Sequence, residues 1–349
     1  MTTLDDIGGW PALLGPLMLG ADLERSQAAA GMSAILHGEA SAAQIAAFAV
    51  ALRQKGETVD ELSGLIDAVL AATDRVYLAP PFDQTALDIV GTGGDRSHSI
   101  NVSTTSMFVL AGGGVAVCKH GNRAMSSACG AGDLLQELGV NLELSAAQVA
   151  ECVRGAGLGF CLATRFHPGF RHAGPVRREL GVPTSFNILG PMANPARVRR
   201  LVIGVADPMV AERMLGVMAL QGAERVLIVH GGDGLDEITT TGPTRTWELA
   251  DGLVRHGTVE PTELGLALAR PDQLTGGVPA LNARLTRAVL AGEHGPHRDI
   301  VVLNAAAGFY VAGRVERIAD GLEMARAAID SGGAAAALDR LIDASNSPA

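Results

Sequence analysis

The chain has few aromatic residues, few cysteines and no excess of positive charge. Phe, Trp and Tyr make up 3% of the 349 residues, so the core must be packed with Ala, Val, Leu and Gly, which favours closely packed helices and tight loops. The net charge of −10, from 27 basic and 37 acidic residues, argues against a general nucleic-acid or acidic-membrane surface. Any anionic ligand must therefore be held by a local basic pocket.

The cysteines and the N-terminal segment indicate the compartment. Neither C-x-x-C spacing nor a metal-ligand pattern connects Cys118, Cys129, Cys152 and Cys161, so we interpret them as reduced, mostly buried residues. The first basic residue is Arg25, so a signal-peptide n-region is lacking. The longest apolar stretches are interrupted by glycine and are shorter than a membrane span. These features predict a cytoplasmic protein that binds neither membranes nor nucleic acid.

The first 79 residues have a helical pattern with few strand formers. Ser41-Ala42-Ala43-Gln44 and Thr58-Val59-Asp60-Glu61 have the form of capping boxes at helix starts. Pro80-Pro81 ends the helical pattern, and a strand-like run follows. We therefore expect a helical domain over residues 1–79 and an α/β domain over residues 80–349.

Beyond the two prolines, short apolar runs alternate with polar loops and helical segments. The runs are rich in β-branched residues and bounded by glycine, as expected of buried strands. The alternation predicts an α/β fold, in which a small all-helical domain joins a large α/β domain with a central, mostly parallel sheet flanked by helices. The expected strands are 86–90, 115–118, 141–144, 201–205 and 226–230.

Two polar loops directly follow the first two expected strands. Gly91-Thr92-Gly93-Gly94-Asp95 leads to Asn101-Val102-Ser103-Thr104, and the second loop contains Lys119-His120-Gly121-Asn122-Arg123. Glycines let several backbone N–H groups point at one phosphate, and Ser103 to Thr105 are candidate caps of a helix whose N-terminus favours an anion. A single glycine loop is more simply a tight turn, but two in succession, the second carrying Lys and Arg, predict a phosphate site.

Two later segments carry charges whose meaning composition leaves open. Residues 160–190 contain four arginines and two histidines, and Glu179 is the only acidic residue among them. A solvated helix face would explain this positively charged run equally well. Asp236-Glu237 follows the last expected strand, where a plain surface turn is the more frequent explanation.

The runs GTGGD, NVST and KHGNRAMSS resemble the signature segments of the anthranilate phosphoribosyltransferase family, within the nucleoside phosphorylase/phosphoribosyltransferase class. The resemblance extends from about Gly38 to the end of the chain. It implies transfer of a phosphoribosyl group from 5-phosphoribosyl 1-diphosphate to anthranilate, in tryptophan biosynthesis, with Mg²⁺ as cofactor. It also implies a homodimer formed through the helical domain, and a segment around 165–190 that returns to this domain and builds the aromatic-acid pocket.

The resemblance also assigns roles to residues. It implies that Arg177 pairs with the substrate carboxylate, and no residue is assigned as general base. For anthranilate it implies Gly91, His120, Asn122, Phe170 and Arg177. For Mg²⁺ it implies Ser103, Asp236 and Glu237. For the phosphoribosyl diphosphate it implies Gly91, Gly94, Asp95, Ser99, Asn101, Val102, Ser103, Thr104, Lys119, His120, Gly121, Asn122, Arg123, Ala124, Met125, Ser126, Ser127 and Ala131.

Three alternatives stay open at this point. A pyrimidine nucleoside phosphorylase has the same fold class, but the KHGNR run, the acidic pair and Arg177 argue against it. A phosphoribosyltransferase of a secondary pathway would use a substituted aminobenzoate. A non-catalytic phosphoribosyl-diphosphate sensor ranks last, because every expected polar position is filled. The chain departs locally from its relatives at Arg96, at Phe170, where some carry tyrosine, and at Gly130-Ala131-Gly132, where serine is common.

Overall fold

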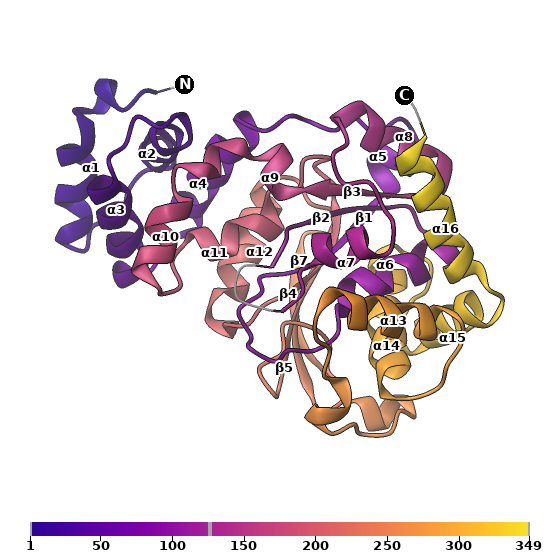
Figure 1. The fold of residues 1–349 in the computed structure, drawn as a ribbon. Helices are drawn as coiled ribbons and strands as arrows, with labels where there is room; N and C mark the ends of the chain where they lie inside the picture. Colours follow the sequence, from indigo (N-terminus) through magenta and orange to yellow (C-terminus); the bar gives the residue numbers. More distant parts are fainter. Residues whose placement is uncertain (1, 125–127, 348–349) are drawn as a thin grey trace.

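A single seven-stranded sheet forms the centre of the chain (Figure 1). The computed structural model describes residues 2–124 and 128–347. The strand order is β3-β2-β1-β4-β5-β6-β7, in which the first five are parallel and the last two antiparallel. The strands are β1 (Leu87–Gly91), β2 (Val117–Gly121), β3 (Leu158–Leu162), β4 (Arg200–Gly204), β5 (Arg225–Gly231), β6 (Thr244–Ala250) and β7 (Leu253–Val259).

Helices cover the sheet and form a separate group at the N-terminal end, as Figure 1 shows. The first four helices make up the small helical domain, so the predicted fold class is confirmed. The helices are α1 (Gly9–Met18), α2 (Arg25–His37), α3 (Ala42–Lys55), α4 (Val59–Ala71), α5 (Phe82–Thr85), α6 (Val102–Gly112), α7 (Ala131–Glu137), α8 (Ala146–Ala156), α9 (Ala163–Phe166), α10 (Gly174–Leu180), α11 (Phe186–Leu189), α12 (Ala211–Leu220), α13 (Pro279–Leu290), α14 (Pro296–Val311), α15 (Ile318–Asp330) and α16 (Gly333–Asn346).

The carboxyl ends of the central parallel strands meet at one edge of the sheet. Gly91 at the end of β1 pairs with Gly204 at the end of β4, and β2 ends beside them at Gly121. A Cβ atom at Gly91 would lie 2.3 Å from Asp236 Oδ2, and one at Gly204 would lie 1.6 Å from the Asp236 carbonyl oxygen. Only glycine allows this close approach, so the strand ends are shaped to receive Asp236.

The helix starts show where local signals decide structure. Ser41 and Thr58 form the predicted capping boxes of α3 and α4. The expectation that Ser103 to Thr105 cap the next helix was wrong: α6 begins at Val102, and the side chain of its N-cap residue makes no capping bond. The Ser103 N–H instead donates to Glu237 Oε1 at 3.0 Å, so a carboxylate distant in sequence caps this helix.

Two expectations about strands need correction. Residues 141–144 form no strand, because the Asn141 backbone and side chain bond to Ser345 of α16 rather than to the sheet. Neither β3 nor the β6–β7 hairpin was predicted. Six of the seven residues of β7 are exposed, so this edge strand lacks the buried apolar pattern that identified β1, β2, β4 and β5.

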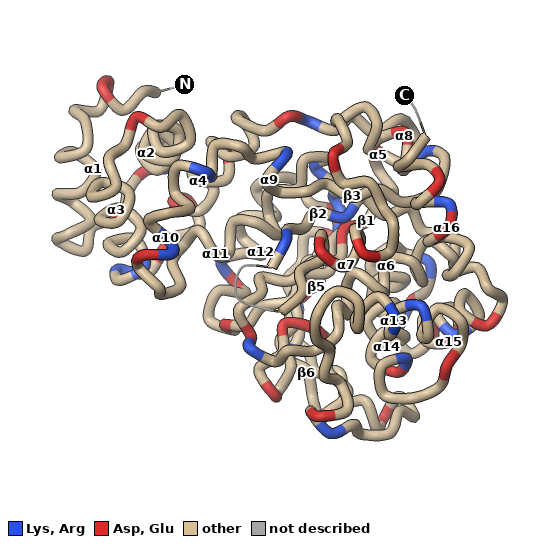
Figure 2. Tube along the Cα trace, viewed as in Figure 1, with Lys and Arg blue, Asp and Glu red and all other residues tan. Residues whose placement is uncertain are grey.

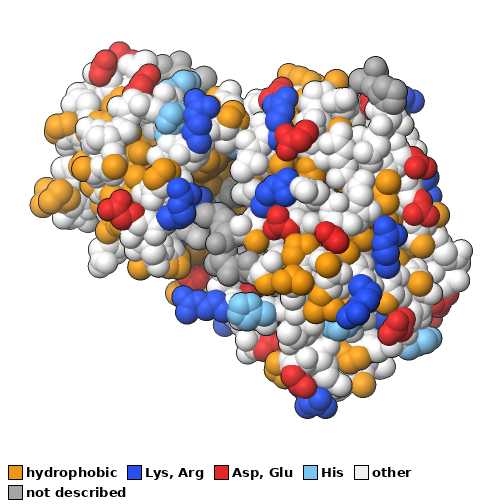
Figure 3. Space-filling view, in the orientation of Figure 1, with side chains coloured by type: hydrophobic (Ala, Val, Ile, Leu, Met, Phe, Trp, Pro, Cys, Tyr) orange, Lys and Arg blue, Asp and Glu red, His pale blue; other side chains and the backbone are white. Residues whose placement is uncertain are grey.

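The chain between α9 and α11 returns to the helical domain. The short turn Pro168–Arg171 packs on α2, α10 packs on α3, and α11 packs on α4. A Cβ atom at Gly169 would lie 2.8 Å from the Leu36 carbonyl oxygen, which shows how closely the turn meets α2. Figure 3 shows a hollow in the surface between the helical domain and the α/β domain.

The distribution of charge, the cysteines and the hydropathy of the helices can be compared with the expectations from the sequence. Figure 2 shows acidic and basic residues intermixed along the whole chain rather than gathered on one face. All four cysteines are buried thiols, as expected. Within the part of the chain that the structure describes, no helix combines the length and apolar character needed to cross a membrane.

Candidate active site

The loop after β1 turns sharply at the carboxyl edge of the sheet. Gly93 and Gly94 adopt φ values of +67° and +85°, and the Gly93 N–H donates to Asp236 Oδ2 at 2.6 Å. The Asp95 carboxylate accepts from the Ser97 hydroxyl at 2.7 Å. An isolated antiparallel bridge between Ser99 and Thr275 holds the far end of the loop. The predicted donor-binding residues of this loop therefore lie together beside the acidic pair.

The acidic pair is buried at the centre of this edge. Asp236 and Glu237 are 9% and 8% exposed. Burial, with the charge of Asp95 as the next cause, raises the pKa of Asp236 to about 7. Burial, with the charge of Asp236 next, raises the pKa of Glu237 to about 8. Ile238, the residue after this pair, is held by the Asn304 side chain of α14. That side chain accepts from the Ile238 N–H at 2.9 Å and donates to the Ile238 carbonyl at 2.8 Å.

Lys119 supplies the positive charge nearest to this pair. It is 2% exposed, and its Nζ donates to the Ser103 hydroxyl at 3.2 Å and to the Ile89 carbonyl. Burial lowers its pKa, whereas the charges of Asp88 and of the acidic pair raise it. Lys119, Ser103 and Glu237 thus form one connected group across β2, α6 and the segment after β5.

The donor set of the predicted metal ligands fits a hard cation. Ser103, Asp236 and Glu237 present only oxygen atoms, and burial followed by repulsion from a neighbouring carboxylate raises the pKa of both carboxyl groups, which a cation would reverse. Among residues 2–124 and 128–347, no three His, Cys, Asp or Glu side chains form a complete metal-binding cluster. Two carboxylates and a hydroxyl suit Mg²⁺ only if water and substrate phosphate oxygens complete its shell.

His120 is held in a single tautomer by its surroundings. Its backbone N–H donates to Asp88 at 3.2 Å, and Asn194 donates to the same carboxylate at 2.7 Å. Its ring Nδ1 lies 3.0 Å from the Gly190 carbonyl oxygen, which can only accept, so Nδ1 carries the proton. Its Nε2 is buried and has no hydrogen-bond partner among the described residues. Burial lowers the pKa of His120 to about 3, so the ring presents a neutral acceptor.

A series of ring contacts leads from His120 to Arg177. The His120 and His167 rings are 4.9 Å apart between centroids, His167 and Phe170 6.1 Å, and Phe170 and Phe186 6.4 Å, all edge to face. The Arg177 guanidinium lies 6.0 Å from the Phe186 centroid. His167 and Phe186 were not predicted as site residues, because nothing in the sequence shows that they face His120 and Arg177.

Arg177 is a half-buried guanidinium without an anionic partner. It makes no hydrogen bond or ion pair within the described residues, and burial is the one cause that lowers its pKa. Desolvating a guanidinium without pairing it is costly, so such a group is well suited to bind a carboxylate. The neighbouring Arg178 is exposed.

The second polar loop is held at both ends by one carboxylate. Asp133 of α7 accepts from the Ala124 N–H at 2.7 Å and from the Gly130 N–H at 3.0 Å, and it pairs with Arg123 at 3.4 Å. A Cβ atom at Gly130 would lie 2.3 Å from the Ala124 nitrogen, which explains glycine at that position. The predicted donor-binding residues Met125, Ser126 and Ser127 lie outside the described residues.

Asn101 joins the two loops. Its Nδ2 donates to the Cys129 carbonyl at 3.1 Å, and its Oδ1 accepts from Asn282 of α13 at 2.8 Å. Asn282 in turn accepts from the Gly277 N–H at 2.7 Å. Asn282, a residue that sequence reasoning left without a role, therefore ties three segments together at the carboxyl edge.

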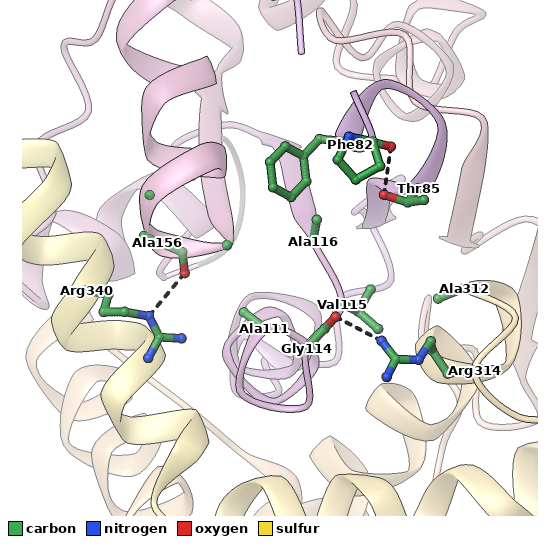
Figure 4. Close-up of a pocket in the computed structure, with 13 residues that line it drawn as sticks. Phe82, Thr85, Ala111, Gly114, Val115, Ala116, Ala156, Ala312, Arg314 and Arg340 are labelled. Atoms are coloured by element: carbon green, nitrogen blue, oxygen red, sulfur yellow. Dashed lines mark hydrogen bonds between the residues drawn. The ribbon is translucent and has the colours of Figure 1, made fainter. Parts of the chain in front are cut away.

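A separate cavity of about 480 Å³ lies at the opposite edge of the sheet (Figure 4). Two arginines flank it: Arg314 donates to the Gly114 carbonyl at 3.0 Å, and Arg340 donates to the Ala156 carbonyl at 3.3 Å. Ala156 is the last residue of α8 and Gly114 lies two residues beyond the end of α6, so both cations lie near helix C-termini, where positive charge is favoured. These arginines therefore have a structural role, and none of the predicted site residues lines the cavity.

The fold and the site together define a glycosyl transferase in which a helical bundle is joined to an α/β domain. The family model described as "Glycosyl transferase family, helical bundle domain" matches residues 11–73, and "Glycosyl transferase family, a/b domain" matches residues 83–335. The chain is 49% identical to the anthranilate phosphoribosyltransferase of Salinispora arenicola, over 96% of each chain. It is 50% identical to that of Thermomicrobium roseum, over 95% of this chain and 94% of the relative. The chain belongs to the anthranilate phosphoribosyltransferase family.

Solved structures show the same relationship. The Thermus thermophilus anthranilate phosphoribosyltransferase superposes with a TM-score of 0.90 at 41% identity, covering 96% of this chain and 99% of that one. The Saccharomyces cerevisiae enzyme, in complex with PRPP and Mg, superposes with a TM-score of 0.89 at 29% identity, covering 97% of this chain and 98% of that one.

Proposed function

We propose that this chain transfers the phosphoribosyl group of 5-phosphoribosyl 1-diphosphate (PRPP) to anthranilate, giving N-(5-phosphoribosyl)anthranilate and pyrophosphate in tryptophan biosynthesis. The observation that carries the proposal is the half-buried Arg177, which has no anionic partner among the described residues and is joined by a series of rings to His120 at the phosphate-binding edge. A planar aromatic acid requires one cationic anchor for its carboxylate and aromatic walls for its ring. Two relatives that are 49% and 50% identical to this chain bear the name of this activity.

The donor would be held at the ends of β1 and β2. Backbone N–H groups of the glycine loop and of the N-terminal end of α6, other than those of Gly93 and Ser103 that already bond to the acidic pair, can approach phosphate oxygens, and Lys119 adds positive charge beside them. Ser103, Asp236 and Glu237 would hold Mg²⁺ together with the diphosphate, as PRPP and Mg are bound together in the yeast enzyme. When bound, Mg²⁺ would neutralise charge that develops on the diphosphate.

The chemistry needs positioning more than proton transfer. The anthranilate nitrogen forms a bond to the anomeric carbon of the ribose, the bond from that carbon to the diphosphate oxygen breaks, and the nitrogen loses a proton to solvent. Arg177 would orient the carboxylate, and His120, with Asn122 and Gly91, would border the place where amine and sugar meet. No residue is assigned as general base, since an aromatic amine attacks in its neutral form.

The test is to follow anthranilate fluorescence in the purified protein. We expect loss of anthranilate only when PRPP and Mg²⁺ are both present, with one pyrophosphate released per anthranilate consumed. Phosphate-dependent cleavage of uridine or thymidine, without use of anthranilate, would instead identify a pyrimidine nucleoside phosphorylase. PRPP binding without turnover would identify a sensor. Turnover of a substituted aminobenzoate alone would keep the reaction class and change the acceptor.

We further propose that the helical domain, with a boundary near Pro80, forms a homodimer contact. Its first and third helices expose large apolar side chains, Met18 at 80%, Leu19 at 88% and Val50 at 43% exposure, and Figure 3 shows apolar side chains on the outer face of this domain. Exposed apolar side chains of this size favour burial against a partner. We expect light scattering after gel filtration to give a dimer for the native chain and a monomer for Leu19→Asp.

A further inference from the structure

Glu57 is a fully buried carboxylate in the turn between α3 and α4. Its side chain is 0% exposed, and its Oε1 accepts from the Ser185 hydroxyl at 2.7 Å. Its Oε2 has no hydrogen-bond partner among the described residues. The nearest cations are Arg213 at 3.7 Å and Arg53 at 3.9 Å, both beyond hydrogen-bond distance.

Three parts of the chain meet at this carboxylate. Glu57 belongs to the helical domain, Arg213 lies on α12 beside the sheet, and Ser185 directly precedes α11 in the returning segment. Two further contacts join the same parts: Arg53 of α3 pairs with Asp207 at 2.8 Å, and α12 comes so close to α4 that a Cβ at position 216 would lie 2.8 Å from a Val59 methyl carbon.

Ser185 connects Glu57 to the acceptor side of the active site. The next residue, Phe186, lies under the Arg177 guanidinium and contacts the Phe170 ring. Fixing Ser185 therefore fixes the aromatic ring that supports Arg177. Because no hydrogen bond or ion pair holds Arg177 within the described residues, its position depends on the placement of α10 and α11.

The junction is only partly satisfied. Besides Glu57 Oε2, the Arg213 Nε and Thr184 Oγ1 atoms are buried without a hydrogen-bond partner among the described residues. Buried polar groups are costly when unpaired, so a contact needed for stability alone is better served by apolar residues or complete pairing. The incomplete pairing therefore indicates that this junction serves a role besides stability.

We propose that Glu57 is a positioning residue for the aromatic acceptor, which acts through Ser185 to place Phe186 and Arg177. This inference rests on the proposed transfer to anthranilate. Among the residues that the structure describes, the polar contacts of Glu57 are with Ser185, Arg213 and Arg53 and not with the donor loops, so its influence should fall on the acceptor and spare PRPP.

The test compares steady-state constants of Ser185→Ala, Glu57→Gln and Glu57→Ala with Asp207→Asn as the matched control. Asp207→Asn breaks an ion pair at the same junction without contacting Ser185. We expect Ser185→Ala and Glu57→Ala to raise the KM for anthranilate about tenfold, with the KM for PRPP unchanged. Glu57→Gln keeps an acceptor for the Ser185 hydroxyl and should have the smaller effect. The double variant Ser185→Ala/Glu57→Ala should have a KM for anthranilate close to that of either single variant, because both substitutions remove the same hydrogen bond.

Hydrogen exchange gives a measurement that does not depend on turnover. Peptides from 174–190 should exchange faster in Ser185→Ala and Glu57→Ala than in the native chain. Their exchange rate should be unchanged in Asp207→Asn. Equal rises in both KM values, effects matched by Asp207→Asn, or unaltered exchange in 174–190 would overturn the positioning role. A native chain that fails to consume anthranilate refutes the proposed function alone, since the exchange measurement still decides whether Glu57 orders this segment.

Discussion

Replacing Arg177 tests the acceptor site most directly. The guanidinium has lost part of its hydration and has gained no anionic partner in return, so a bound carboxylate would supply its only charge-assisted hydrogen bonds. Losing such a pair costs on the order of 1.5–3 kcal/mol, which corresponds to about a 10- to 100-fold rise in the KM for anthranilate in Arg177→Ala. Arg177→Lys keeps the charge but loses the bidentate hydrogen-bond geometry, so its KM for anthranilate should lie between those of the native chain and Arg177→Ala.

The assay is fluorescence-detected consumption of anthranilate at saturating PRPP, followed by the reverse titration. The KM for PRPP should hardly move, because Arg177 lies on α10 and the donor loops follow β1 and β2. Arg178→Ala is the matched control, since this exposed neighbour should leave both constants nearly unchanged. An equal rise in both KM values, or an effect of Arg178→Ala as large as that of Arg177→Ala, would refute carboxylate pairing by Arg177.

Other parts of the site give further measurable expectations. The pKa values of Asp236 and Glu237 are raised from 3.8 and 4.5 to about 7 and about 8, so the ligand-free protein should lose stability as pH rises from about 4 to 8. Asp236→Asn with Glu237→Gln should therefore raise Tm more at pH 8 than at pH 5, while abolishing Mg²⁺-dependent PRPP binding in calorimetry; equal Tm changes at both pH values would contradict this. The pKa values of His120 and His167 are lowered to about 3 and about 4, so NMR titration should show both rings neutral above pH 5, and the stability they contribute should be lost only as pH falls from about 6.5 toward 4. Asn304→Leu leaves two buried backbone groups unpaired and should lower the free energy of unfolding in urea by about 2–5 kcal/mol; a loss below about 1 kcal/mol would show that water replaces the amide.

The sequence by itself determined the elements whose signals are local. Capping boxes at Ser41 and Thr58 predicted the starts of α3 and α4, because a side chain bonds to the backbone three residues away. Buried β-branched runs predicted β1, β2, β4 and β5 to within three residues at either end. The two polar loops and the acidic pair were also predicted to follow strands, since parallel strands place their carboxyl ends at one edge. Both loops begin later than predicted, because Gly91 belongs to β1 and Lys119, His120 and Gly121 belong to β2. Family resemblance then supplied the residue roles.

Tertiary structure decided everything that depends on residues distant in sequence. Glu237, rather than a local hydroxyl, caps α6, and Asn141 bonds to α16 instead of joining the sheet. Periodicity could not show either, because both partners lie more than 100 residues away. The same holds for His167, which faces His120 only because the returning segment packs on the helical domain. It also holds for Glu57, whose carboxylate is buried against Ser185 of the returning segment and Arg213 of α12. Burial and pairing are properties of the assembled core, so the pKa values and the unpaired charge of Arg177 exist only in the folded chain.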